Sequence, residues 1–222
     1  MELRHEHKHQ INEFDRIILS GRLKQVMHID EYANDEGEYL VKSLYFDNYR
    51  DKALREKIDG TDKREKFRIR YYNENTSFIR LEKKTKINGM CNKVSERITA
   101  DECEKIICGD TDFLMNKDSD LLKEFYAKIH YQVLRPKCIV VYERESYIYD
   151  VSRTRVTLDK NIRGSTNVSE FLNSDLVCTH LYPYSVLEVK YNEFIPETVK
   201  KAVTVKSRRS AAFSKYAAVR FY

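Results

Sequence analysis

Apolar and polar residues alternate along several short segments of the chain, as they do in strands that bury one face. The clearest alternation covers residues 66–71, 79–84, 155–159 and 187–192. Leu40–Phe46 and Lys137–Tyr149 are rich in Val, Ile and Tyr, which favour strands. Because side chains in a strand point to opposite faces with period two, we predict strands in all six segments.

Helical signals are fewer and lie between these strands. A capping box begins at Thr99, Pro196 stands where a first helical turn would begin, and Asn12 is a further candidate N-cap. Apolar residues with helical spacing follow each of these three signals: Phe14, Ile17, Ile18 and Leu19 after Asn12, Ile106 and Ile107 after Thr99, and Val199 and Val203 after Pro196. Leu121, Leu122, Phe125 and Ile129 form a fourth stripe with helical spacing. Strands with interspersed helices predict a largely antiparallel α+β fold.

The chain organisation favours one domain over residues 1–222. No Pro/Ser-rich linker, internal repeat or low-complexity tract divides the 222 residues. The six glycines are too far apart for the Gly-rich fingerprints of Rossmann or P-loop nucleotide sites. If this protein handles phosphates, it must therefore use side chains.

The sequence also favours a cytoplasmic protein with reduced cysteines. No stretch approaches the 18 apolar residues of a transmembrane segment, and the charged N-terminus lacks the apolar core of a signal peptide. The five cysteines are odd in number and form no C-x-x-C pair. We therefore expect no structural zinc site and no disulfide framework.

The polar faces of the predicted strands are strongly basic. They carry twelve bases and four acids, whereas the whole chain has 40 Lys+Arg, 35 Asp+Glu and a net charge of +5. These faces are either the solvated side of a sheet packed on its other face, or the inner wall of a closed barrel. They consist of Arg4, Glu6, Lys8, Lys66, Arg68, Arg70, Arg80, Glu82, Lys84, Lys86, Arg144, Arg153, Arg155, Asp159, Glu188 and Lys190.

A closed barrel would make these faces a wet, positive tunnel for polyanions. Arginine is suited to bidentate phosphate contacts. The isolated acids among the bases suit Mg²⁺ or Mn²⁺, which can bridge phosphate oxygens.

Eight short motifs in one order resemble a known family. They are Arg4-His5-Glu6-His7-Lys8, Ser43-Leu44-Tyr45-Phe46-Asp47, Phe67-Arg68-Ile69-Arg70-Tyr71, Leu81-Glu82-Lys83-Lys84, Tyr142-Glu143-Arg144, Arg155-Val156-Thr157-Leu158-Asp159, Leu187-Glu188-Val189-Lys190-Tyr191 and Ala212-Phe213-Ser214-Lys215-Tyr216. The series resembles the VTC domain, the polyphosphate polymerase domain of the vacuolar transporter chaperone complex. That domain belongs to the triphosphate tunnel metalloenzyme, or CYTH-like, superfamily.

The resemblance implies an eight-stranded antiparallel tunnel β-barrel with peripheral helices. It implies a metal-dependent polymerase that passes the γ-phosphoryl group of a nucleoside triphosphate such as ATP to a polyphosphate chain. By motif, the catalytic residues would be Lys8, Arg68, Arg70, Lys84, Arg144, Arg155 and Lys190. Of these, Arg68, Arg70, Arg144 and Arg155 would bind substrate together with Ser214 and Lys215. Glu188 would hold Mn²⁺ or Mg²⁺, with Glu6 and Glu82 as further candidate ligands.

This sequence departs from the superfamily at the first strand, where Arg4 replaces the first acid of an E-x-E-x-K motif. The added base favours a phosphate-rich tunnel over a carboxylate-rich hydrolase site. The characterised polymerases work beside transmembrane subunits and an SPX domain. Neither is present here, and recruitment to a membrane partner stays open.

Two other functions stay open. One is a tripolyphosphatase or nucleoside triphosphatase of the same fold, and the other is a non-catalytic module that binds polyphosphate or nucleotide. No aromatic-basic signature indicates specific nucleic-acid recognition. His5, His7 and His9 alternate on the strand face opposite Glu6 and Lys8; we expect them on the outside of the barrel rather than in a metal site.

Overall fold

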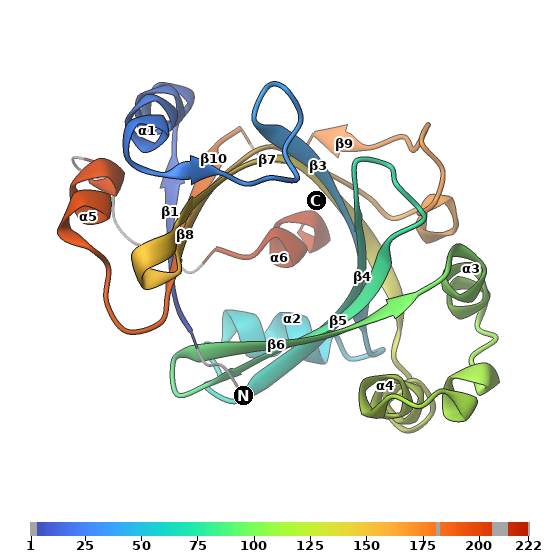
Figure 1. The fold of residues 1–222 in the computed structure, drawn as a ribbon. Helices are drawn as coiled ribbons and strands as arrows, with labels where there is room; N and C mark the ends of the chain where they lie inside the picture. Colours follow the sequence, from blue (N-terminus) through green and yellow to red (C-terminus); the bar gives the residue numbers. More distant parts are fainter. Residues whose placement is uncertain (1–3, 181–182, 206–212, 222) are drawn as a thin grey trace.

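Eight antiparallel strands form one continuous sheet that curls into a ring (Figure 1). The computed structural model describes residues 4–180, 183–205 and 213–221. Two short strands, β2 (His28–Ile29) and β9 (Thr179–His180), pair with β7 and β8. In spatial order the eight are β1 (His5–Ile11), β10 (Ser185–Tyr191), β8 (Thr154–Ser165), β7 (Arg135–Tyr149), β3 (Glu38–Asp47), β4 (Arg64–Tyr72), β5 (Ile79–Ile87) and β6 (Met90–Ile98).

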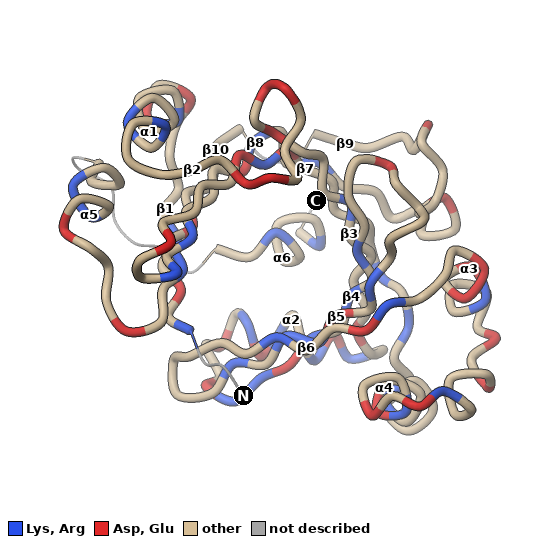
Figure 2. The backbone as a smooth tube through the Cα atoms, viewed as in Figure 1, with Lys and Arg blue, Asp and Glu red and all other residues tan. Residues whose placement is uncertain are grey.

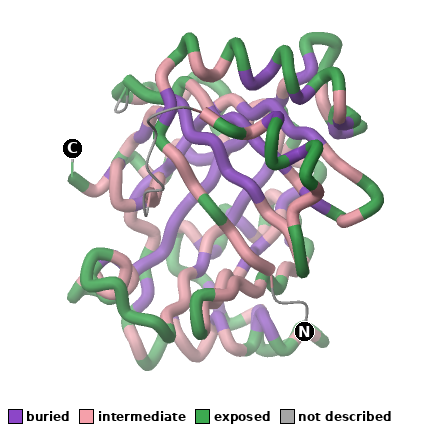
Figure 3. The backbone as a smooth tube through the Cα atoms, turned by 90° about the vertical axis from the view of Figure 1, so that its left-hand side faces the viewer, coloured by how far each residue is buried: buried purple, intermediate pink, exposed green. Residues whose placement is uncertain are grey.

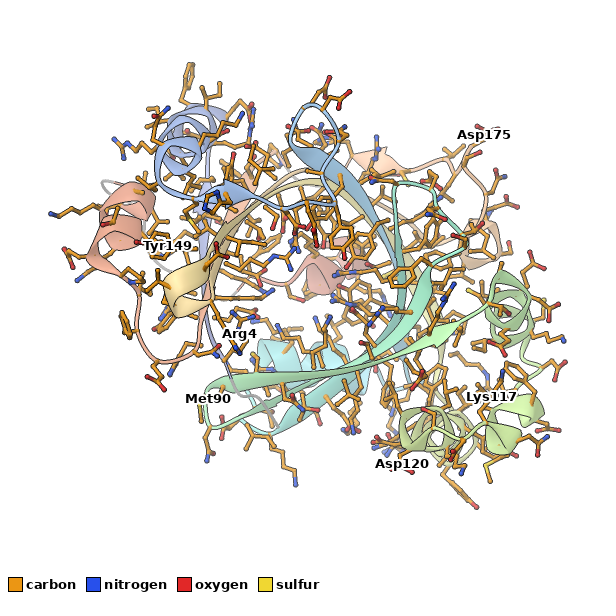
Figure 4. The ribbon with its side chains drawn as sticks, viewed as in Figure 1. Arg4, Met90, Lys117, Asp120, Tyr149 and Asp175 are labelled. Carbon is orange, nitrogen blue, oxygen red and sulfur yellow. The ribbon has the colours of Figure 1, made fainter. Side chains whose placement is uncertain are left out.

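The ring is held together at its two edge strands by a single bridge. Arg4, just before β1, and Cys91 of β6 exchange two backbone hydrogen bonds of 3.1 Å. Figure 4 shows Arg4 near Met90, where β6 begins. No further pairing joins β1 to β6 in the described ranges. The predicted eight-stranded antiparallel sheet is therefore confirmed, while the backbone pairing that closes it into a barrel is limited to this one bridge.

Helices surround the ring, with one exception. Helices α1 (Glu13–Val26), α3 (Ala100–Cys108), α4 (Asp120–Tyr131) and α5 (Glu197–Val203) lie outside it, whereas the C-terminal helix α6 (Lys215–Arg220) lies within its outline (Figure 1). Helix α2 (Lys52–Ile58) packs against β3, β4 and α6. Short 3-10 turns cover Asp112–Asn116, Asp150–Ser152 and Val168–Glu170.

The apolar rows of the strands face the outer helices. Phe67, Ile69 and Leu81 pack with Phe125 of α4 in one buried cluster, and Leu158 and Leu187 pack with α1 in another. Figure 3 shows that the buried positions follow the strands. Since neighbouring residues of a strand point to opposite faces, the basic rows between them face the interior.

The interior position of the basic rows decides between the two interpretations left open by the sequence. Arg70, Arg144 and Glu188 are buried, and Asp159 has 0% of its surface exposed. The interpretation of these rows as a solvated outer face is therefore wrong. A period-two pattern cannot distinguish the alternatives, because it is the same whether the polar row faces bulk water or a polar interior.

Most local predictions are confirmed, and three differ. Asn12 and Thr99 each form a complete capping box. Pro196 is the N-cap of α5 rather than part of its first turn. Helix α2 and strand β6 were not predicted from the sequence. Strand β6 follows a tight turn at Asn88-Gly89, where both residues have positive φ.

Candidate functional site

Lys, Arg, Asp and Glu positions occur along the strands of the ring (Figure 2), and many of their side chains line its interior. Two cavities of about 930 and 260 Å³ share Glu6, Lys84 and Cys91 among their lining residues. Basic residues outnumber acidic ones in this interior. The charges are arranged in three clusters, each built around a buried carboxylate.

The first cluster is centred on Asp159 of β8. Arg144 of β7 forms a bidentate pair with it, at 2.6 Å from Nε to Oδ1 and 2.8 Å from Nη2 to Oδ2. Lys215, at the start of α6, also binds Oδ2. Burial raises the pKa of Asp159, but Arg144 and Lys215 outweigh it and hold that pKa at about 2. This cluster attaches α6 to the wall of the ring.

The second cluster lies where β1 meets β10. Lys8 binds Glu6 at 2.8 Å and lies 3.9 Å from Glu188. Lys190 binds Glu188 at 2.5 Å, and Lys84, which belongs to β5, binds Glu6 at 2.5 Å. Burial favours the protonated carboxyl groups, but the lysines hold the pKa of both glutamates below its usual range. Both carboxylates are therefore ionised at neutral pH.

The third cluster is centred on Glu82 of β5. Arg68 binds it at 2.6 Å, Lys93 of β6 at 3.0 Å, and Arg70 approaches to 4.0 Å. Arg70 also donates hydrogen bonds to Ser43 Oγ at 2.9 Å and to Tyr142 Oη at 3.1 Å. The two arginines predicted to hold phosphate therefore share one wall, fixed in place by Glu82.

The remaining predicted residues lie at the edges of these clusters. Arg155 lines the larger cavity and donates to Ser146 Oγ at 2.9 Å and Asp30 Oδ2 at 2.5 Å. Ser214 lines the smaller cavity and caps α6 by accepting a hydrogen bond from the Ala217 backbone N–H. The structure thus brings all the predicted substrate-binding residues to one connected interior.

The predicted metal ligands fall into two places. Glu188 is close enough to Glu6 to oppose its ionisation and act to raise its pKa, whereas Glu82 pairs with arginines in the third cluster. No group of three His, Cys, Asp or Glu side chains suited to a metal ion occurs among the described residues. The carboxylate pair Glu6 and Glu188 is therefore the arrangement that best fits a divalent cation, with phosphate and water completing its shell.

The N-terminal histidines lie on the other face of β1. The rings of His5 and His7 stack on Tyr191, with centroids 5.0 and 5.7 Å away. His7 Nε2 also lies 3.0 Å from Tyr191 Oη. These contacts account for two of the three alternating histidines by packing with an aromatic neighbour.

The ordered motifs and the charged interior agree with a family comparison. The family model that describes the VTC domain matches residues 3–220. The chain belongs to the VTC domain family. No curated protein matches this VTC domain.

Solved structures share the fold of this VTC domain at low identity. The putative adenylyl cyclase HpAC1 from Hippeastrum, described as having a dominant triphosphatase activity, is 15% identical with a TM-score of 0.57. The match covers 100% of this chain and 96% of that one. A putative adenylate cyclase from Bacillus halodurans is 12% identical with a TM-score of 0.50, over 90% and 86% of the two chains. At this identity the likeness concerns the fold.

Sequence reasoning missed several interior residues of the VTC domain. Asp159 stood among the isolated acids suited to a divalent cation, but neither it nor Lys66 was among the site residues that the resemblance implied, and Tyr45 was given no role in the site. Lys93 was missed together with its strand. The Asn88-Gly89 pair could have located it, since Asn-Gly is a strong signal for a two-residue hairpin turn.

Lys66 and Tyr45 form a titratable pair beside the smaller cavity. Lys66 Nζ lies 5.2 Å from the centroid of the Tyr45 ring, and Arg68 donates to Tyr45 Oη at 3.1 Å. Burial, reinforced by Lys84 and Arg68, lowers the pKa of Lys66 to about 7. Burial raises the pKa of Tyr45, but Arg68 and Lys66 outweigh it and lower that pKa to about 7.

These shifts predict that polyanion affinity falls as the pH rises from about 7 to about 9. Burial also lowers the pKa of Lys190, to about 8. A bound phosphate favours the protonated amines, so the complex holds more protons than the free protein and weakens when they are lost. Binding isotherms for tripolyphosphate across this range, without metal, measure the slope. Lys66→Met should flatten it, and an affinity independent of pH would contradict the assignment.

Proposed function

We propose that this protein is a metal-dependent polyphosphate polymerase that uses a nucleoside triphosphate as phosphoryl donor. The observation that carries the proposal is the buried excess of bases, held by strands on several sides of one interior. A cavity with low-dielectric walls and one sign of excess charge attracts a polyanion strongly. Membership of the VTC domain family supports the same substrate class.

The donor set near β1 and β10 fits a divalent cation of the Mg²⁺ or Mn²⁺ type. Glu188 and Glu6 would hold it, and the phosphates of the substrate would supply further oxygen ligands. Such an ion, when bound, neutralises charge on phosphoryl oxygens. Lys8 and Lys190, which now pair with Glu188, would then be available to phosphate.

The basic residues would bind and align the two phosphate chains. Arg68 and Arg70 have their guanidinium groups fixed by Glu82, Ser43 and Tyr142, so little side-chain entropy remains to be lost on binding. Arg144 and Lys215 would contact the chain from the opposite cluster. Phosphoryl transfer depends mainly on positioning and charge neutralisation, which this arrangement supplies.

We predict that ATP with Mn²⁺ yields long-chain polyphosphate. Each transfer releases one ADP and no free phosphate, so ADP should accumulate while free phosphate stays near background. Gel electrophoresis of the polymer, together with ADP and phosphate assays, measures this ratio. Omitting the metal is the control.

Equal amounts of ADP and free phosphate, without polymer, would instead support a triphosphatase. Tight polyphosphate binding without any release of ADP would support a binding module. No helix in the described ranges has the length and apolar character to cross a membrane.

A further inference from the structure

Helix α1 exposes an apolar face on the side away from the ring. Phe14 has 79% of its surface exposed, Ile17 54% and Ile18 52%. The opposite side of the helix, with Leu19 and Leu23, packs into the core. The helix is thus apolar on two sides, and each large apolar side chain of the outer side has more than half of its surface exposed.

Gly21 continues this outer face one turn further on. A side chain built at Gly21 would meet nothing within 4 Å, and the helix does not require positive φ there. Glycine in a helix interior is destabilising relative to alanine. Neither the backbone conformation nor the packing within this chain explains why a glycine stands at this position. The glycine therefore points to another molecule that approaches the helix closely here.

The charges at the two ends of this face are complementary. The first turn of α1 carries Glu13, which also pairs with Arg16 of the same helix, and the last turn carries Lys24. Both residues are exposed. Two copies of α1 placed antiparallel would set the acidic end of one helix beside the basic end of the other.

We propose that the outer face of α1 pairs with the same face of a second copy of this chain. The helices run antiparallel about a two-fold axis that passes between Ile17 and Ile18. This register places Phe14 over the partner subunit's Gly21, and Ile17 beside the partner's Ile17. It also brings Glu13 close to the partner's Lys24. The contact is isologous and therefore closes as a dimer.

The size of the face sets the strength of the association. Three large apolar side chains per copy cover less than the roughly 800 Å² per partner of a standard interface. The dimer should therefore be concentration-dependent, with a dissociation constant in the micromolar range.

Sedimentation velocity over a wide concentration range tests the pairing. The native chain should shift from monomer to dimer, whereas Ile17→Glu should stay monomeric. Gly21→Gln should also stay monomeric while keeping or raising its melting temperature, because Gln is the better helix former. That combination separates a lost contact from a damaged fold.

Charge reversal tests the antiparallel register. Glu13→Lys and Lys24→Glu should each weaken the dimer, and the double variant should restore it. A native chain that stays monomeric at every concentration would overturn the proposal. So would a monomer that binds phosphatidylcholine–phosphatidylglycerol vesicles through this face, since a lipid surface would then be its occupant.

Discussion

Glu188→Gln should lower the rate of phosphoryl transfer by about 100-fold or more while polyphosphate affinity is kept or rises. The amide cannot supply the anionic oxygen that a divalent cation requires. The substitution also leaves the partly buried amines of Lys8 and Lys190 without their shared negative neighbour, which favours a polyanion. Turnover with ATP and Mn²⁺, and metal-free binding of polyphosphate, are the two measurements.

Glu193→Gln is the matched control, since it makes the same chemical change at an exposed residue after β10. It should behave as the native protein. Unchanged turnover in Glu188→Gln would remove this glutamate from the proposed metal site. A parallel loss of turnover and binding would show that it mainly supports the fold.

Asp159→Asn should destabilise the protein by about 3–5 kcal/mol, because it leaves Arg144 and Lys215 buried against a neutral amide. The native carboxylate is fully buried and joins both cations. Its pKa of about 2 lies below the ordinary 3.8, so its stabilising effect is present above about pH 4 and is lost as the pH falls towards 2. Urea unfolding at neutral pH measures the loss.

An exposed ion pair provides the comparison for Asp159. Glu197→Gln removes one partner of the Glu197–Lys200 pair, whose atoms lie 3.8 Å apart at the surface. Its effect should stay within about 0.5 kcal/mol. Adding Lys215→Met to Asp159→Asn should recover part of the stability. A single variant as stable as the native chain would show that the cluster does not stabilise the ring.

The strands and the chemical character of the site could be predicted from single segments. Arg68 and Arg70 alternate with apolar residues, and this is enough to place them together on one face of a strand. Asn12 and Thr99 likewise specify their helix starts by local hydrogen bonds. Such features depend on residues a few positions apart, so a sequence pattern contains them.

The organisation of the interior could not be predicted in this way. Glu6 pairs with Lys84 across 78 positions, and Arg155 pairs with Asp30 across 125. Which acid meets which base depends on the curvature of the sheet, and alternation says nothing about it. Helix α2 was missed for a different reason, since its N-cap Asp51 has left-handed φ and forms no side-chain cap.

The internal pairing of the charges also affects how ionic strength should act on this protein. A polyanion bound by unpaired bases releases counterions for each base engaged, so its affinity falls steeply with added salt. Here Arg68, Lys84 and Arg144 already hold carboxylates as fixed internal counterions. The steepness of the salt dependence should follow the surplus of bases over acids in the ring. It should not follow the number of bases that contact the bound polyanion. The interior can thus be densely charged towards its ligand and yet only modestly sensitive to the surrounding electrolyte.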